Sequence, residues 1–273
     1  MPELPEVETI VRTLEKSLKG KRIISINFIY PKLLETQSEY PLEALEGTYF
    51  KDFHRRGKYL WFEMSNGLHW ILHLRMEGKF HLYDEVKVPS KHTHCVINFD
   101  GGTIHYLDTR KFSRMAVVSD PIRYLETKNL GFEPFDPNLS GDYLYQKIHQ
   151  SNRVMKTILL DQSIIAGIGN IYADEILFEA QIHPLTTGSK ISKKQCDMIV
   201  ETAQVILMNA IKAGGTTIRS YTSSLNVTGR FQVNLNAYGK AGEPCSRCGK
   251  TLERIVVSGR STVFCGKCQK VRR

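Results

Sequence analysis

The segment Lys58-Tyr-Leu-Trp-Phe-Glu-Met-Ser-Asn-Gly-Leu-His-Trp-Ile-Leu-His-Leu74 decides the fold of the first half of the chain. Its two flanks, Lys58–Met64 and His69–Leu74, are rich in the aromatic and branched residues that β-strands favour. Between them, Ser65-Asn66-Gly67 is a turn signal. The sequence therefore predicts a β-hairpin here.

Further strands are expected on both sides of this hairpin. Short apolar segments recur between residues 22 and 118, and Asp100-Gly101-Gly102 marks a second hairpin turn. Several closely spaced strands are typical of a sandwich or barrel. Before them, an apolar stripe over residues 5–19 predicts an amphipathic helix. The other expected strands are Arg22–Tyr30, Lys79–Tyr83, Cys95–Phe99, Thr103–Leu107 and Arg114–Val118.

The second half of the chain has a different period. Prolines and glycines between Asp120 and Asp142 predict a linker, and beyond it the apolar residues recur at helical spacing. The sequence thus indicates an α+β protein of more than one domain, with an N-terminal β-sandwich flanked by helices. The expected helices are Tyr143–Gln150, Val154–Leu160, Ile171–Ala180 and Ser192–Lys212.

Four of the six cysteines form two pairs with the spacing C-x2-C-x16-C-x2-C. This spacing is typical of a structural site for one Zn²⁺ ion. A disulfide framework would need an oxidising compartment, and nothing in the sequence exports the chain. Residues 244–273 are too few to bury a core, so we expect a β-hairpin that depends on its metal. The expected ligands are Cys245, Cys248, Cys265 and Cys268, whereas Cys95 and Cys196 are expected to be small buried apolar residues.

The charge of the chain favours a polyanionic partner. There are 37 Lys and Arg residues against 28 Asp and Glu, a formal net charge of +9. Many basic proteins bind no nucleic acid, so charge alone does not decide. The acidic, proline-containing start is unlike a signal peptide, and no apolar run reaches the roughly 18 residues of a membrane span. We therefore expect a cytoplasmic protein with no membrane partner.

The first residues offer an unusual nucleophile. If Met1 is removed, Pro2 presents a secondary amine, and α-amino groups titrate near pH 8. An unprotonated amine can attack an electrophilic carbon and form a Schiff base. Glu3 and Glu6 are candidate acid/base groups beside it. The structural alternative is that proline and glutamate are common at the start of a helix.

Eight short motifs along the chain indicate a family. In order they are Met1–Thr9, Arg55–Leu60, His73–Gly78, Asp108–Phe112, Ala166–Tyr172, Gly214–Arg219, Tyr238–Lys240 and Gly259–Cys265. With the four paired cysteines they cover residues 2 to 268, and in this set and order the chain resembles the formamidopyrimidine-DNA glycosylases. The resemblance implies a bacterial base excision repair enzyme, associated with the nucleoid through DNA. It implies a bifunctional glycosylase and AP lyase that removes 8-oxoguanine and formamidopyrimidines from double-stranded DNA.

The resemblance also implies catalytic roles. Pro2 would attack C1′ and form the Schiff base, Glu3 would promote opening of the sugar ring, and Glu6 would support the N-terminus. Lys58 would contact phosphate and assist β-elimination, and Arg260 would assist δ-elimination. These roles are chemically coherent, because a lyase needs an amine, a proton shuttle and cations near the departing phosphates. Lys58 on its own would be interpreted as one of many surface lysines.

The remaining implied residues contact DNA. Met76, Arg110 and Phe112 resemble the residues that fill the void left by the extruded nucleotide. In isolation, Met76 and Phe112 would be taken as core side chains. The expected backbone and phosphate contacts are His92, Arg153, Lys156 and Asn170, and the expected loop over the damaged base, residues 217–229, includes Arg219 and Tyr221. Metal binding, the alternative for His92, lacks an evident third ligand.

The expected organisation has three parts and a monomeric state. Residues 1–130 would form the catalytic sandwich, 131–225 a helix–two-turn–helix domain, and 226–273 the end of the loop and the zinc finger. Two alternatives stay open. Endonuclease VIII-like enzymes, which act on oxidised pyrimidines, usually begin Met-Pro-Glu-Gly-Pro-Glu, whereas this chain has Leu4. A non-catalytic zinc-ribbon DNA-binding protein would explain the charge and the cysteines but not the N-terminal residues.

Overall fold

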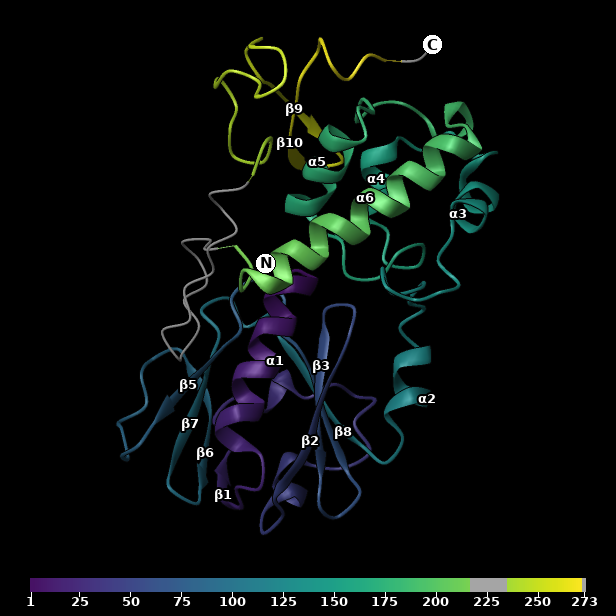
Figure 1. The fold of residues 1–273 in the computed structure, drawn as a ribbon. Helices are drawn as coiled ribbons and strands as arrows, with labels where there is room; N and C mark the ends of the chain where they lie inside the picture. Colours follow the sequence, from purple (N-terminus) through teal and green to yellow (C-terminus); the bar gives the residue numbers. More distant parts are fainter. Residues whose placement is uncertain (217–234, 272–273) are drawn as a thin grey trace. The chain divides into compact units, whose positions relative to one another are not determined.

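The computed structural model describes residues 1–216 and 235–271, which belong to two compact units (Figure 1). Among the described residues, the first unit contains 1–128 and 214–216, and the second contains 129–213 and 235–271. The predicted three-part division at residues 130 and 225 stays a prediction. No helix in the described part of the chain is long and apolar enough to cross a membrane.

The first unit is a β-sandwich of two four-stranded antiparallel sheets, ordered β1-β6-β7-β5 and β2-β3-β4-β8. The predicted hairpin is β3–β4, in which Phe62 pairs with Trp70. The strands are β1 (Ile23–Asn27), β2 (Phe50–Arg56), β3 (Tyr59–Met64), β4 (His69–His73), β5 (Lys79–Tyr83), β6 (Thr93–Phe99), β7 (Gly102–Leu107) and β8 (Arg114–Val118).

One hydrophobic core joins the two sheets and helix α1 (Leu4–Leu18). Phe62 contacts Trp70 and Phe80 edge-on, with ring centroids 5.3 and 6.0 Å apart, so the inward residues of both sheets interlock. The helix adds its apolar stripe to the same core, as the sequence predicted. The stripe residues are Val7, Ile10, Val11, Leu14 and Leu18.

One strand and one α-helix of the first unit were not predicted. Strand β2 lacks the alternation of buried and exposed residues that is typical of a strand. A register shift between Phe50 and Asp52 allows Phe50 and Phe53, three residues apart, both to be buried. Helix α2 (Pro121–Glu126) lies in the segment predicted to be a linker. Its signals were present, because Asp120 caps two backbone amides and Pro121 stands in the first turn. Two short 3-10 helices, Pro31–Leu33 and Leu42–Leu45, complete the part of this unit that the structure describes.

The second unit is helical and ends in a small hairpin, as expected. Helix α6 is capped by Ser192 and Gln195 and packs against α3 and α5. The C-terminal hairpin β9–β10 packs with strand β10 on α5. The elements are α3 (Gly141–Ile148), α4 (Met155–Leu160), α5 (Asn170–Glu179), the 3-10 helix Gly188–Lys190, α6 (Lys193–Lys212), β9 (Glu253–Val257) and β10 (Arg260–Phe264).

Candidate active site

The chain is buried from its second residue onward, at the start of α1. Pro2 is buried and Glu3 is 2% exposed. The backbone N–H of Glu3 donates to Oε2 of Glu6 at 2.9 Å, which satisfies an amide at the start of α1. The two predicted acid/base groups are therefore held next to the chain terminus by hydrogen bonding within one turn.

The second carboxylate oxygen of Glu6 holds a distant part of the chain. Oε1 accepts hydrogen bonds from the backbone N–H of Thr216 at 2.8 Å and from its hydroxyl at 3.1 Å. Gly215 comes so close that an added Cβ would lie 2.9 Å from Oε1, and its φ of +77° also favours glycine. Glu6 thus joins the N-terminus to residue 216, which directly precedes the expected lesion loop.

The terminal amine of the chain lies in a poorly solvated, charged environment. Burial lowers the pKa of the Met1 amine, and the positive charge of Lys58 lowers it further. The carboxylates of Glu3, Glu6 and Glu77 act in the opposite direction, but the net direction is down. A nucleophilic amine must be unprotonated, so this environment suits the chemistry predicted for residue 2.

Lys58 is positioned by a tight turn between β2 and β3. The connection has two residues, and the first of them, Gly57, has φ +59°, a left-handed conformation that favours glycine. Arg55 braces the turn, because its guanidinium donates to the carbonyl of Gly57 at 3.1 Å and to Glu8 on α1 at 2.8 Å. Lys58 is only 6% exposed, so it is not an ordinary surface lysine.

Arg110 and Phe112 are presented by a loop built around Asp108. The Asp108 side chain is fully buried, and its carboxylate accepts the backbone N–H groups of Arg110 at 2.9 Å and Ser113 at 2.8 Å. Lys111 between them has φ +57°, a conformation that this bonding sustains. Phe112 is 48% exposed, so it is not a core residue. The Arg110 guanidinium carbon lies over its ring, 4.8 Å from the ring centroid.

Met76 and His92 lie in neighbouring loops of the same unit. Met76 is partly exposed and follows Arg75, which has φ +52° at the end of β4. His92 is partly exposed, and its carbonyl accepts the N–H of Asp108 at 3.1 Å. The first unit therefore contains the predicted catalytic residues 2, 3, 6 and 58 together with the predicted DNA contacts 76, 92, 110 and 112.

His73 supports the Met76 loop and was not predicted as a site residue. Its Nδ1 accepts the N–H of Arg75 at 3.0 Å, and its ring meets Tyr59 edge-on. Burial lowers the pKa of His73 from the ordinary 6.5 to about 3, and the charges of Arg75 and Lys58 act in the same direction. The imidazole is therefore neutral at physiological pH.

Acid is expected to destabilise the protein through His73. A depressed folded-state pKa means that the stabilisation is present above pH 6.5 and is lost as the pH falls towards 3, because only the unfolded chain takes up the proton. His73→Asn keeps an acceptor for Arg75 but does not titrate. Between pH 6.5 and 4, the free energy of unfolding of the wild type should fall by up to roughly 3 kcal/mol more than that of the variant. Urea denaturation at both pH values measures this difference, and parallel curves would contradict it.

In the second unit, the predicted phosphate-binding turn precedes α5. Gly167 has φ +98°, and Gln162 holds the turn by accepting its N–H at 2.9 Å and donating to the carbonyl of Ile168 at 2.8 Å. Asn170 at the start of α5 donates to the carbonyl of Ser261 on β10 at 3.0 Å. Arg153 and Arg260 are both exposed, Arg260 at the start of β10 after the tight Ser258-Gly259 turn.

Lys156 differs from its expected role as a direct phosphate contact. Its side chain is fully buried, and Nζ donates to Oδ1 of Asp174 at 2.6 Å and to the carbonyl of Asn170 at 3.0 Å. An ammonium enclosed in this way does not present itself to a phosphate. The sequence could not show this, because the pairing carboxylate comes from the next helix, α5.

The four predicted cysteine ligands converge as a zinc site requires. All four sulfurs lie within 4.8 Å of one another, with Sγ–Sγ distances of 4.0 Å for Cys245–Cys268 and 3.5 Å for Cys248–Cys265. A tetrahedral Zn²⁺ with Zn–S bonds near 2.3 Å separates its sulfurs by about 3.8 Å. The cluster therefore fits one structural zinc ion, and none of the four thiols forms a disulfide.

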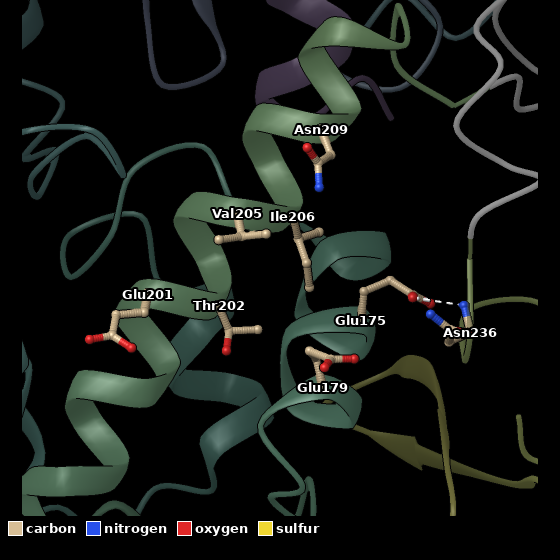
Figure 2. A pocket seen from close by; sticks show the side chains of 8 residues that line it. All are labelled: Glu175, Glu179, Glu201, Thr202, Val205, Ile206, Asn209 and Asn236. Carbon is tan, nitrogen blue, oxygen red and sulfur yellow. Dashed lines mark hydrogen bonds between the residues drawn. The ribbon is translucent and has the colours of Figure 1, made fainter. Parts of the chain in front are cut away.

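Glu175 is a functional candidate that the sequence reasoning missed. In Figure 2 its side chain points from α5 to Asn236, and its carboxylate accepts the N–H groups of Asn236, Ala237 and Tyr238, each at 2.8 Å. Glu175 thus holds the segment that begins at residue 235. Together with Val205 it also lines a pocket of about 700 Å³. The signal that could have found it is a glutamate within a mostly apolar helical segment, because a carboxylate that is buried with such a helix needs hydrogen-bond partners.

The structure thus gathers the predicted residues within each unit separately. Arg153, Lys156, Asn170, Arg260 and the cysteines belong to the second unit, and the catalytic N-terminus belongs to the first. Arg219 and Tyr221 lie outside the described residues. The roles assigned to individual residues stay predictions.

Comparisons with known proteins match nearly the whole length of the chain. Three family profiles match: "Formamidopyrimidine-DNA glycosylase N-terminal domain" at residues 1–115, "Formamidopyrimidine-DNA glycosylase H2TH domain" at 130–222, and "Zinc finger found in FPG and IleRS" at 242–271. A formamidopyrimidine-DNA glycosylase of Bacillus cereus is 43% identical, covering 98% of this chain and 99% of that protein.

Solved structures agree with this similarity. The Lactococcus lactis Fpg protein in complex with DNA containing an abasic site has a TM-score of 0.92 and 39% identity, covering 98% of this chain and 99% of that one. The same protein in complex with Fapy-dG-containing DNA also has a TM-score of 0.92 and 39% identity, covering 98% and 100%.

Proposed function

Because the chain belongs to the formamidopyrimidine-DNA glycosylase family, we propose that its own N-terminal proline is the nucleophile of a glycosylase and AP-lyase reaction. The protein is a base excision repair enzyme that removes oxidised purines from double-stranded DNA and cleaves the resulting abasic site. Its metal is one structural zinc ion. A non-catalytic zinc-ribbon protein would not account for the match of residues 1–115 to a glycosylase domain.

The observation that supports Pro2 as the nucleophile is that Glu6 accepts hydrogen bonds from two parts of the chain near the N-terminus. One oxygen binds the N–H of Glu3 and the other binds Thr216, which fixes the backbone next to Pro2. The Pro2 nitrogen, exposed as an amine once Met1 is removed, would then be held in place and ready to attack, because little reorientation is needed in the transition state.

The reaction then runs through a covalent intermediate. The nitrogen of processed Pro2 bonds to C1′, the damaged base leaves, and Glu3 protonates the ring oxygen so that the sugar opens to a Schiff base. β-Elimination then breaks the bond from C3′ to its phosphate oxygen, and δ-elimination breaks the corresponding bond at C5′. Lys58 assists the first elimination and Arg260 the second by stabilising departing phosphate charge.

The DNA contacts complete the proposal. Met76, Arg110 and Phe112 would occupy the space of the extruded nucleotide, since Phe112 and Arg110 are already stacked on each other in solvent. His92, Arg153 and Asn170 would hold the DNA backbone, and Arg219 and Tyr221 would belong to the loop over the damaged base. The zinc ion supplies only a crosslink that folds the hairpin carrying Arg260.

The proposal also covers organisation and location. The catalytic domain would span residues 1–130 and the DNA-binding helical domain residues 131–225. Residues 226–273 would contain the end of the loop over the damaged base and the zinc finger. The protein would act as a monomer in the bacterial cytoplasm, where reducing conditions keep the zinc-binding thiols intact.

Lys58→Ala is expected to separate the two activities. Lys58 lowers the pKa of the Met1 amine, and we expect it to act in the same direction on the Pro2 amine once Met1 is removed. Without this charge more of the Pro2 amine would be protonated, which weakens attack on an intact nucleotide. We expect incision of an 8-oxoguanine duplex to slow roughly 10- to 100-fold, because both base release and β-elimination are affected. Incision of a preformed abasic site, which needs the elimination but no base release, should slow less. Gel assays of both duplexes, with an oxidised-pyrimidine duplex for comparison, measure the rates.

Lys51→Ala is the matched control, because Lys51 lies on the same hairpin and is exposed to solvent. It should leave both rates unchanged. If the wild type releases no base from the 8-oxoguanine duplex, the proposed function is wrong. If Lys58→Ala slows both substrates equally, the function stands and the effect of Lys58 on base release is wrong; if it slows neither, its role in β-elimination is wrong as well.

A further inference from the structure

A fully buried ion pair lies where α4, α5 and the zinc hairpin meet. The side chains of Lys156 and Asp174 both have zero exposure, and Nζ lies 2.6 Å from Oδ1. Burial raises the pKa of Asp174 to about 6 against the opposing effect of Lys156, so the carboxyl is still mostly ionised at neutral pH. The proposed mechanism leaves this pair without a role.

The pair connects two segments that carry proposed DNA contacts. Lys156 also donates to the carbonyl of Asn170, the first residue of α5, at 3.0 Å. The other oxygen of Asp174, Oδ2, accepts the backbone N–H of Val263 on β10 at 3.1 Å. Asn170 in turn donates to the carbonyl of Ser261 at 3.0 Å, so the polar contacts form a closed circuit between the turn and the strand.

Stability alone is a poor explanation for such a pair. Removing two charges from water is costly, and well-packed apolar side chains in the same place commonly stabilise a protein as well or better. Hydrogen-bonded charges differ from apolar contacts in that their energy depends on direction as well as distance, so they restrict the relative placement of their partners more closely. The Val263 amide, three residues from Arg260 on β10, is one of those partners.

We propose that Asp174 is a positioning residue that fixes strand β10, and with it Arg260, against the Asn170 turn, so that both phosphate-binding groups act at one spacing. The inference rests on the proposed function, because it assigns Arg260 to the second elimination. Lys156 acts within this circuit and not as a phosphate ligand.

Asp174→Asn isolates the role. The variant has nearly the same shape, but only one of its two terminal side-chain atoms can accept a hydrogen bond, so either Lys156 or the Val263 amide loses its partner. Misplacement of a catalytic group by about 1 Å can slow a reaction roughly 100-fold. We expect δ-elimination on a preformed abasic site to slow roughly 10- to 100-fold while β-elimination changes little, so that the β-product accumulates.

The experiment is a double-mutant cycle with Arg260→Gln, read as the ratio of δ- to β-elimination rates. If Asp174 acts through Arg260, the double variant should be no slower in δ-elimination than Arg260→Gln alone. Asp142→Asn, an exposed aspartate of the same unit paired with Lys193, is the matched control and should match the wild type. Zinc content and thermal unfolding are measured for every variant.

The outcomes separate the two hypotheses. An unchanged product ratio in zinc-loaded, folded Asp174→Asn, or additive losses in the double variant, would overturn the positioning role. If Asp174→Asn does not fold, Lys156→Met combined with Asp174→Leu replaces the pair by apolar groups, and a wild-type product ratio in that variant overturns the inference equally. A wild type that cleaves neither bond would instead refute the proposed function.

Discussion

Protein that retains Met1 is expected to be almost inactive, at least roughly 1,000-fold slower than processed protein in base release. With Met1 in place, the nitrogen of Pro2 is an amide whose lone pair is delocalised into the carbonyl, so it cannot attack C1′. DNA affinity should change by only a few-fold, because the phosphate-binding groups are untouched. Mass spectrometry of the N-terminus, followed by single-turnover kinetics on an 8-oxoguanine duplex, measures the effect.

Pro2→Gly in processed form is the matched control. It has a primary terminal amine on the same backbone, held by the same Glu3–Glu6 hydrogen bond. We expect it to form a Schiff base more slowly than the wild type but faster than the Met1-retaining protein, with DNA binding preserved. Equal activity of Met1-retaining and processed protein would rule out the terminal amine as nucleophile.

Cys248→Ser is expected to abolish zinc binding and DNA binding together. Serine is a poor zinc ligand, and the hairpin has too small a core to fold without its metal. The core cluster that contains the cysteines includes few other buried residues, among them Phe178, Leu252 and Val263. Zinc content should fall from one per chain to near zero, and affinity for an abasic-site duplex should fall roughly 100-fold or more.

Cys196→Ala is the control for loss of a thiol, because Cys196 is buried in α6 and does not belong to the zinc cluster. It should retain zinc and bind DNA normally. Metal analysis and fluorescence anisotropy test both variants. A Cys248→Ser protein that lacks zinc yet binds and cuts DNA at the wild-type rate would show that the hairpin is dispensable.

Most of the fold could be predicted because local signals agree with the tertiary structure. The β3–β4 hairpin, helix α1 and the capped helix α6 all lie within a residue or so of their expected bounds. Strand β2 could not be predicted from its period, because the irregular pairing at Phe50 and Asp52 moves its buried residues out of alternation. Helix α2 was missed because prolines and glycines around it dominated the pattern.

The candidate site divides in the same way. The cysteine spacing was sufficient to identify the zinc ligands, whereas the roles that the N-terminal motif assigns to the residues around Pro2 stay predictions. The sequence could not indicate that Lys156 is buried against Asp174, or that Glu6 reaches Thr216, because these partners are brought together only by tertiary packing. Asp108 begins one of the eight motifs, and nothing in the sequence shows that it organises the loop that presents Arg110 and Phe112.

The most direct test of the account is to map the covalent link itself. Processed wild-type protein is mixed with an 8-oxoguanine duplex and borohydride, digested, and sequenced by tandem mass spectrometry. We expect the reduced sugar remnant on the α-nitrogen of Pro2. A stable adduct on Lys58 or any other lysine, or no adduct despite base release, would contradict the account.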